Sequence, residues 1–229
     1  MSEQWESRSP LGLVVSMTLL GAAGLLVGSL VGVVTFSLLG STLSLSVDAP
    51  PGQLVFSIGT YLGVAAVGVL YLLQHRLPLS YIRLRSPSGR DILWAVSTAI
   101  TLLALGVTIP TLVGGLGLPF ADHSIADSIA VNPTVALVSI PISLFVVGPA
   151  EEFLYRGVIQ TRLTDAFETN RAVAIASLLF ALTHILAYFD PGNVAGTLVT
   201  LIVVLLPLGA ILGAVYERTG NLFVPALAH

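Results

Sequence analysis

Three groups of ionisable residues interrupt stretches of the chain that are otherwise apolar. The first is Glu151-Glu152 followed by Arg156, the second is His184, and the third is His229. Ionisable side chains inside apolar spans are costly, so they usually face a cavity, pair with one another and mark a functional site. A carboxylate together with two imidazoles is a set that could activate water and stabilise a developing negative charge.

Within the first group, Glu152 and Arg156 stand four residues apart, in the order that favours an ion pair on a helix. In an apolar setting such a pair can neutralise itself. That leaves Glu151, about 100° away round the helix, without a cation on its own helix. A desolvated carboxylate of this kind can serve as a general base near neutral pH. Two structural alternatives stay open: an ion pair that only joins two helices, and a histidine that only hydrogen-bonds between helices.

The three groups are predicted to lie at a similar depth in the membrane. Counted inward at ~1.5 Å per helical residue from the arginine near the end of each helix, the separations are roughly 17–20 Å. The pairs counted are Glu151 from Arg162, His184 from Arg171 and His229 from Arg218. Level side chains on three helices are what a buried site would require.

Several other chemistries lack their sequence signatures. The chain has no cysteine, which excludes disulfides, iron–sulfur clusters and a thiol nucleophile. It has no H-E-x-x-H zinc motif, no G-x-S-x-G turn and no phosphate-binding loop. Glu151, His184 and His229 are of types that bind zinc, but they lack ligand spacing along a helix, so a metal is left open and no cofactor is required. His75 and His123 are expected to be surface residues.

The composition is that of a membrane protein. Of the 229 residues, 55% are hydrophobic and only 9% are charged, whereas a soluble domain is about 25% charged. Such a chain cannot cover itself in water, and we expect membrane lipids around it. The net charge is only −3, and the absence of a basic patch argues against a nucleic-acid partner.

Uncharged stretches long enough to cross a bilayer, which takes roughly 20 residues, recur along the chain. The six full spans that we expect are residues 11–39, 54–73, 92–113, a segment from 134 into the Glu-Glu motif, 172–189 and 194–215. A seventh begins near Asn221 and stops short at His229. The fold predicted is therefore an all-α polytopic transmembrane bundle of about seven to eight helices, the last of them truncated.

The fourth span contains two helix-disturbing positions. We expect it to bend at Pro141 and again at Gly148-Pro149. Proline suits the first position of a helix, so a helix that breaks and restarts at Pro149 would place Glu151 beside a cavity.

Arginines alternate between successive loops. The arginine-rich segments are residues 74–90, 156–171 and the loop at Arg218, and the arginine-free loops are residues 41–53, 114–133 and 190–193. By the positive-inside rule this alternation predicts an integral protein of the cell membrane with a cytoplasmic N-terminus.

We expect two regions within one bundle. Residues 1–133 form an N-terminal three-span membrane region, and residues 134–229 form a catalytic helical core that carries all three polar groups. Small residues that recur every four positions are typical of close helix packing, and we assign them that structural role alone. They are Gly24, Gly28 and Gly32 in the first span and Gly209 and Gly213 in the sixth.

The motifs resemble those of the CPBP intramembrane proteases, which include the type II CAAX prenyl endopeptidases and the Abi proteins. The family motifs are E-E-x-x-x-R, F-x-x-x-H, and a T-G-x-L turn that precedes a helix with a histidine. In this sequence they are Glu151-Glu152-Phe153-Leu154-Tyr155-Arg156, Phe180-Ala181-Leu182-Thr183-His184, and Thr219-Gly220-Asn221-Leu222 followed by His229. The resemblance covers about residues 135–229.

The resemblance implies a role for each polar residue. Glu151 would activate water and His184 would help to bind that water. Glu152 and Arg156 would organise the site or the substrate backbone, and His229 would help to stabilise the tetrahedral oxyanion. In the family an Asn or Asp usually follows this last histidine by four positions, beyond the end of this sequence.

The function predicted is that of an intramembrane endopeptidase with a glutamate-activated water. Its partner would be a peptide or protein substrate, cut near its C-terminus in CAAX-type relatives, with prenylation left open. Two alternatives remain: a catalytically silent membrane scaffold or immunity-type protein, and a proton-coupled transporter, since buried Glu, Arg and His also form proton relays.

Overall fold

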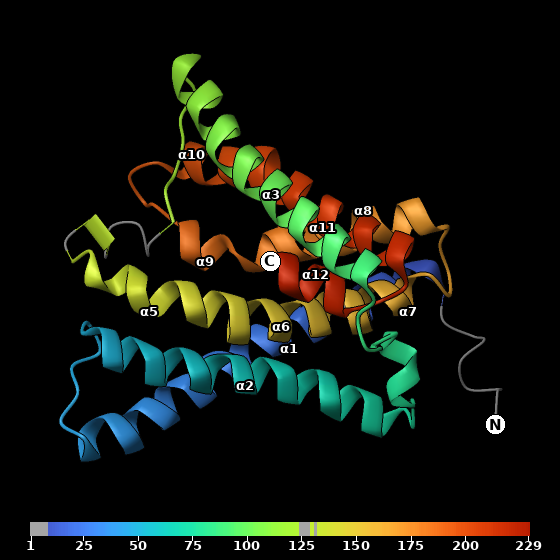
Figure 1. Ribbon diagram of the computed structural model, residues 1–229, viewed down its shortest axis with the longest axis horizontal. Coiled ribbons are helices and arrows are strands. Elements are labelled where there is room, and N and C mark those ends of the chain that lie inside the picture. The colour runs from blue at the N-terminus through green and yellow to red at the C-terminus, as the bar shows by residue number, and fades with distance from the viewer. Residues whose placement is uncertain (1–8, 124–128, 131) are drawn as a thin grey trace.

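The structure is a computed structural model that describes residues 9–123, 129–130 and 132–229. Within those ranges every regular element is helical and no strand is present, which confirms the all-α prediction (Figure 1). In the described part of the chain, five helices are long and apolar enough to cross a membrane, and one further apolar helix is shorter. The protein is an integral membrane protein, as its composition predicts.

The first three long helices begin at residues that favour helix starts. They are α1 (Pro10–Thr35), continued by the π-helical turns of η1 (Phe36–Gly40), α2 (Pro50–Gln74) and α3 (Gly89–Gly115). Proline opens α1 and α2, where its missing N–H has no helical partner to lose. Helix α3 begins with a capping box, in which Ser88 and Asp91 each accept a hydrogen bond from the backbone N–H of the other.

The fourth long helix is continuous from Thr134 to Leu163. It consists of α5 (Thr134–Ile142), η3 (Ser143–Val147), α6 (Gly148–Glu152), η4 (Phe153–Gln160) and α7 (Thr161–Leu163), of which η3 and η4 are π-helical. The prediction that the helix breaks at Pro149 is therefore wrong. The Gly148 N–H donates to the carbonyl of Ser143, five residues back, so the wider turns before Pro149 accommodate its missing donor without ending the helix.

The expectation of one uninterrupted span over residues 172–189 is also wrong. Helix α8 (Thr169–Thr183) ends at His184, and the short α9 (Ile185–Tyr188) follows. The His184 N–H donates to the carbonyl of Ala181, only three residues back, at 3.1 Å. This tight turn interrupts the α-helical pattern at the histidine itself.

The last long helix runs from Val194 to Thr219 and leads into a short terminal helix. It is made of α10 (Val194–Val199), the π-helical η5 (Thr200–Leu205) and α11 (Leu206–Thr219), and it is followed by α12 (Phe223–Ala228). Gly220 ends α11 in the left-handed conformation, with φ of 58°, which glycine adopts at little cost. The chain reverses there, and α12 returns into the bundle.

Packing between helices places α6 and α12 in the middle of the molecule. Helices α1 and α2 pack side by side, α12 lies against both α3 and α6, and α11 packs on α8 (Figure 1). The glycine pattern of the first span has the packing role expected of it, because a Cβ at Gly28 or Gly32 would clash with the side chains of Val64 or Thr60 on α2. One core cluster joins α1 and α2 to the C-terminal helices, with Met17 and Tyr71 packed beside Leu154 and Tyr216.

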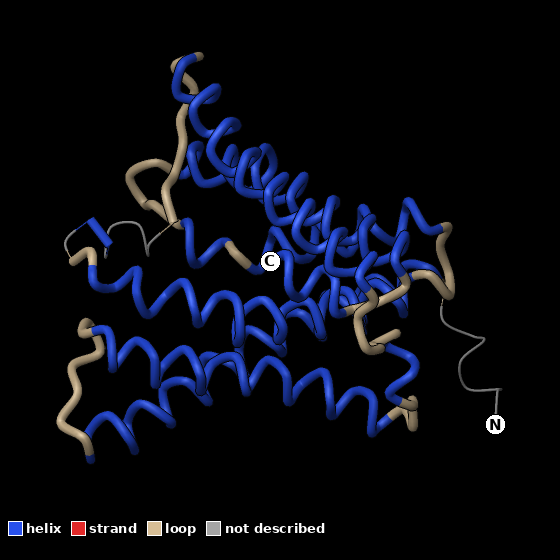
Figure 2. The backbone as a smooth tube through the Cα atoms, in the orientation of Figure 1, coloured by secondary structure: helices blue, strands red, loops and turns tan. Residues whose placement is uncertain are grey.

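The connections gather at two ends of the bundle, as Figure 2 shows. The arginine-rich segments share one end: the connection from α2 to α3, which includes the 3₁₀ turn η2 (Leu79–Ile82), the connection from α7 to α8, and the turn after α11. The placement of these connections agrees with the segmentation expected from the arginines.

Candidate active site

The two glutamates of the first motif lie on α6 and are buried in the bundle. Glu151 is 8% exposed and Glu152 is fully buried. Helix α6 lies between two π-helical segments, and such wide turns occur frequently at functional sites because they redirect side chains. Burial of two adjacent carboxylates requires compensation, which comes from an arginine on the same long helix and from histidines on other helices.

Arg156 compensates Glu152, as the four-residue spacing predicts. Its Nε lies 3.2 Å from Oε2 of Glu152, and both side chains are almost completely buried. One terminal nitrogen of the guanidinium donates to the carbonyl of Gly209 at 3.0 Å. The guanidinium carbon also lies 4.5 Å from the centre of the Phe180 ring, an arrangement that adds cation–π attraction.

The glycines of the sixth span have a use beyond helix packing. Gly209 and Gly213 expose carbonyls that accept hydrogen bonds from Arg156 and from Gln160, which lies one turn further along η4, at 3.0 Å each. A Cβ at Gly213 would lie 2.6 Å from the side-chain oxygen of Gln160. Glycine therefore allows two buried polar side chains of the fourth helix to reach the backbone of α11.

His184 is oriented by its own helix. Its Nδ1 lies 2.8 Å from the carbonyl oxygen of Phe180, and the two rings are 4.4 Å apart. A carbonyl only accepts hydrogen bonds, so Nδ1 carries a proton, and in the neutral imidazole Nε2 is the acceptor. That Nε2 faces Oε2 of Glu151 at 3.7 Å.

His229 approaches the same carboxylate from α12. Its Nδ1 lies 3.0 Å from Oε1 of Glu152, and its Nε2 lies 3.6 Å from Oε2 of Glu151. Helix α12 comes this close because position 148 has no side chain. A Cβ at Gly148 would lie 3.1 Å from Cβ of His229 and 3.3 Å from the carbonyl oxygen of Ala226.

The structure thus brings together all five residues that the sequence indicates. They come from three different helices and contact one another, whereas their depth in the membrane stays a prediction. No residue that the structure describes hydrogen-bonds to Oε2 of Glu151, and this oxygen faces two imidazole nitrogens at nearly equal distances. Among the described residues no group of three His, Cys, Asp or Glu side chains is arranged to hold a metal ion.

Two further residues near the site were missed in the sequence. Tyr61 of α2 lies near Glu151. His123, expected at the surface, is partly buried, and its ring lies edge-on to that of Tyr188 at 4.9 Å. Burial lowers the pKa of His123, and so does the nearby His184, whereas Glu151 opposes the change. Neither residue belongs to a recognisable sequence motif. The only signal in the sequence was the polar group itself, a tyrosine hydroxyl in an apolar span and an imidazole in a loop.

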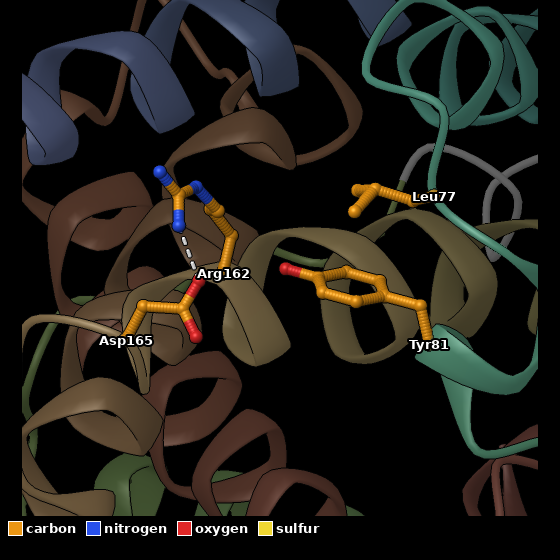
Figure 3. A pocket seen from close by; sticks show the side chains of 4 residues that line it. All are labelled: Leu77, Tyr81, Arg162 and Asp165. Carbon is orange, nitrogen blue, oxygen red and sulfur yellow. Dashed lines mark hydrogen bonds and ion pairs between the residues drawn. The ribbon is translucent and has the colours of Figure 1, made fainter. Parts of the chain in front are cut away.

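A separate pocket lies at the arginine-rich end of the bundle. It has a volume of about 210 Å³ and is lined by Leu77, Tyr81, Arg162 and Asp165 (Figure 3). Arg162 and Asp165 form an ion pair on its wall. None of the five clustered residues lines this pocket, so it is distinct from the carboxylate–histidine site.

The segment that contains the five clustered residues matches a known protein family. Residues 133–229 match the family described as type II CAAX prenyl endopeptidase Rce1-like. The resemblance is confirmed. This Rce1-like segment contains all five clustered residues, whereas Tyr61 and His123 lie outside it.

A curated relative matches this chain over part of its length. The uncharacterized protein YpbD of Bacillus subtilis (strain 168) is 38% identical over 80 residues, which are 35% of this chain and 34% of that protein. The chain therefore spans about a third of that relative. No solved structure matches the chain.

Proposed function

We propose that the protein is an intramembrane endopeptidase in which Glu151 activates the attacking water. The observation that carries the proposal is the convergence of two histidine Nε2 atoms on one buried carboxylate oxygen, Oε2 of Glu151, at 3.6 and 3.7 Å. The Rce1-like match over residues 133–229 supports the same class of reaction.

The separations fit a water-mediated arrangement. They exceed the usual 2.7–3.2 Å of a direct hydrogen bond to nitrogen, and polar contacts of this length are commonly bridged by water. In the neutral form of His184, Nε2 accepts, so a water between the two side chains would donate one hydrogen to His184 and the other to Glu151. Its lone pairs would then be free to attack a carbonyl carbon.

The chemistry then follows from the remaining contacts. As the water oxygen bonds to the peptide carbonyl carbon, its proton passes to Glu151, and the carbonyl oxygen becomes an oxyanion. Glu152, hydrogen-bonded to Nδ1 of His229, favours the imidazolium form. The Nε2–H of that form would donate to the oxyanion. When the carbon–nitrogen bond breaks, Glu151 returns the proton to the leaving amine.

In this proposal Glu152 and Arg156 position the groups that react. Glu152 orients His229 through Nδ1, and Arg156 balances the charge of Glu152 in the apolar interior. Because Arg156 is fixed by Gly209 and Phe180, the orientation of His229 is tied to α8 and α11 as well as to α6.

The substrate proposed is a peptide bond of a membrane-associated protein. The matched family is named for CAAX prenyl endopeptidases, so a prenylated carboxyl-terminal tail is the first substrate to test, beside the same tail without the prenyl group. By the positive-inside rule, the arginine-rich end of the bundle would lie on the cytoplasmic side of the cell membrane.

The test is cleavage of these two peptides by purified protein in detergent. Glu151→Gln is expected to lower kcat by at least ~10²-fold, the usual contribution of a general base, with an unchanged melting temperature. His184→Ala is expected to lower it similarly. The matched control is Glu168→Gln, at an exposed glutamate outside the site.

Three results would decide against the proposal. Cleavage that survives Glu151→Gln would exclude Glu151 as the base. Absence of cleavage of either peptide by folded wild type would favour a silent scaffold. Proton-coupled flux in liposomes that Glu151→Gln abolishes, without peptide cleavage, would favour a transporter.

A further inference from the structure

The position of His229 depends on how the start of α12 is fixed. Helix α12 has only six residues, Phe223–Ala228, and so short a helix has little stability of its own. A tilt of roughly 10° at its start would move its far end by ~1.5 Å, given ~1.5 Å of rise per residue. The hydrogen bond from His229 to Glu152 is 3.0 Å long, so a shift of this size would break it.

The turn before α12 is bound by a segment from the other half of the sequence. Asn221 is fully buried, and its side-chain oxygen accepts from the backbone N–H of Phe223 at 3.2 Å and of Arg85 at 3.3 Å. The N–H of Leu222 donates to the carbonyl of Arg83 at 3.1 Å. The connection between α2 and α3 thus pairs with the turn through its backbone.

Arg85 joins this turn to the start of α3. Its guanidinium makes two hydrogen bonds to Asp91, at 2.7 and 3.0 Å, and donates to the carbonyl of Thr219 at 3.2 Å. Asp91 is itself fixed by the N–H and hydroxyl of Ser88, both at 2.7 Å. The planar fork of arginine suits this simultaneous binding, which a lysine ammonium cannot reproduce.

Arg83 extends the same connection to the helix that carries Glu151. It binds Glu217 at 2.7 Å, and Glu217 also accepts from Gln160 of η4 at 2.9 Å. Beyond the turn, Val224 of α12 packs with Ala95 of α3 in one buried cluster. The α2–α3 connection therefore fixes the start of α12 relative to both α3 and the fourth helix.

We propose that Arg85 is a positioning residue for His229, assisted by Arg83, so that a segment outside the Rce1-like match sets the geometry of the site. The catalytic consequence rests on the proposed peptidase function, whereas the structural consequence does not. A misplacement of ~1 Å can cost ~10²-fold in rate, so Arg85→Ala is expected to lower kcat by ~10-fold or more while KM changes little.

A double-mutant cycle tests whether Arg85 acts through His229. On the His229→Ala background, Arg85→Ala is expected to cause no further loss, within about 2-fold. On the His184→Ala background it is expected to cause its full loss, because His184 is oriented by Phe180 on its own helix. Arg90→Ala, at an exposed arginine beside Asp91, is the matched control and should leave activity unchanged. Equal losses on both histidine backgrounds would overturn the proposal.

Amide hydrogen exchange in detergent tests the same proposal without any substrate. Arg85→Ala is expected to speed exchange in residues 223–229 and to leave residues 170–183 unchanged. Arg85→Lys, which keeps the charge but not the fork, is expected to give an intermediate rate and covers the case in which Arg85→Ala fails to fold. Unchanged exchange in residues 223–229 with both variants would overturn the positioning role. If the wild-type protein cleaves neither peptide, the peptidase proposal fails, but hydrogen exchange still tests whether Arg85 fixes the start of α12.

Discussion

The two histidines of the site face the same carboxylate oxygen but are oriented by different means. His184 is oriented by the carbonyl of Phe180, four residues earlier on the same helix. His229 is oriented by Glu152 of α6, 77 residues away in the sequence, and by a turn that packs on the α2–α3 connection. One imidazole is thus positioned locally and the other only by tertiary structure, so substitutions elsewhere in the protein should affect His229 far more than His184.

The largest effect is expected from loss of the Glu152 charge. Glu152→Gln keeps the shape of the side chain but leaves the Arg156 guanidinium buried without its carboxylate. Breaking a buried pair in this way costs about 3–5 kcal/mol. The free energy of unfolding should fall by that amount, measured by denaturant unfolding in detergent, and peptidase activity should fall because His229 loses its charged partner.

The same measurement on Glu168→Gln, an exposed glutamate, provides the control and should show no loss of stability. A Glu152→Gln protein as stable as wild type would mean that the ion pair contributes nothing to folding. The comparison of the two histidines would then rest on the hydrogen bond to His229 alone.

An intermediate effect is expected from a single added methyl group between α6 and α12. Gly148→Ala places a Cβ 3.1 Å from that of His229, which forces α12 away from Glu152 by a few tenths of an ångström or more. We expect kcat to fall ~10-fold, since reacting groups tolerate little displacement. The distance from His184 to Glu151 should be unaffected.

Gly106→Ala is the matched control, because a Cβ there meets no atom of the described residues within 4 Å. Both variants should fold, and kcat of Gly148→Ala should be ~10-fold lower than that of Gly106→Ala. Equal activities would show that α12 can shift without consequence, which would remove the main difference between the two histidines.

The smallest effect is expected from the tyrosine that lies near Glu151. Tyr61→Phe removes a hydroxyl group close to the carboxylate but leaves both histidines in place. If the hydroxyl donates to the carboxylate during the reaction, kcat should fall about 3–10-fold, in line with the energy of about 1 kcal/mol that one hydrogen bond contributes. Tyr81→Phe, at a tyrosine that lines the separate pocket, should leave kcat unchanged. A Tyr61→Phe enzyme with full activity would limit the site to residues of the Rce1-like segment.

Much of the site could be predicted because its residues violate the surrounding pattern. Charged and imidazole side chains in apolar spans are rare, so Glu151, Glu152, Arg156, His184 and His229 were visible in the sequence, and the structure brings all five together. The arginines of the α2–α3 connection indicated only the orientation of the chain in the membrane. Nothing in the sequence linked Arg83 and Arg85 to the turn at Asn221.

The errors concern backbone details that depend on hydrogen bonds between turns. Proline at position 149 was expected to break the fourth helix, but the π-helical turns of η3 carry the helix through it. The span over residues 172–189 was expected to be continuous, but a three-residue turn ends α8 at His184. Local propensity cannot decide between an α-helical, a tighter and a wider turn, because their energies differ little and packing selects among them.

The sequence by itself determined that this is a membrane bundle, because so few charges cannot cover a soluble domain. It also determined which side chains pair along one helix, such as Glu152 with Arg156, since helical spacing alone sets their separation. Only the tertiary structure decided that His229 meets Glu151, that Tyr61 joins the site, and that Gly148 must lack a side chain. These contacts arise between helices distant in the sequence, and their geometry follows from how whole helices pack.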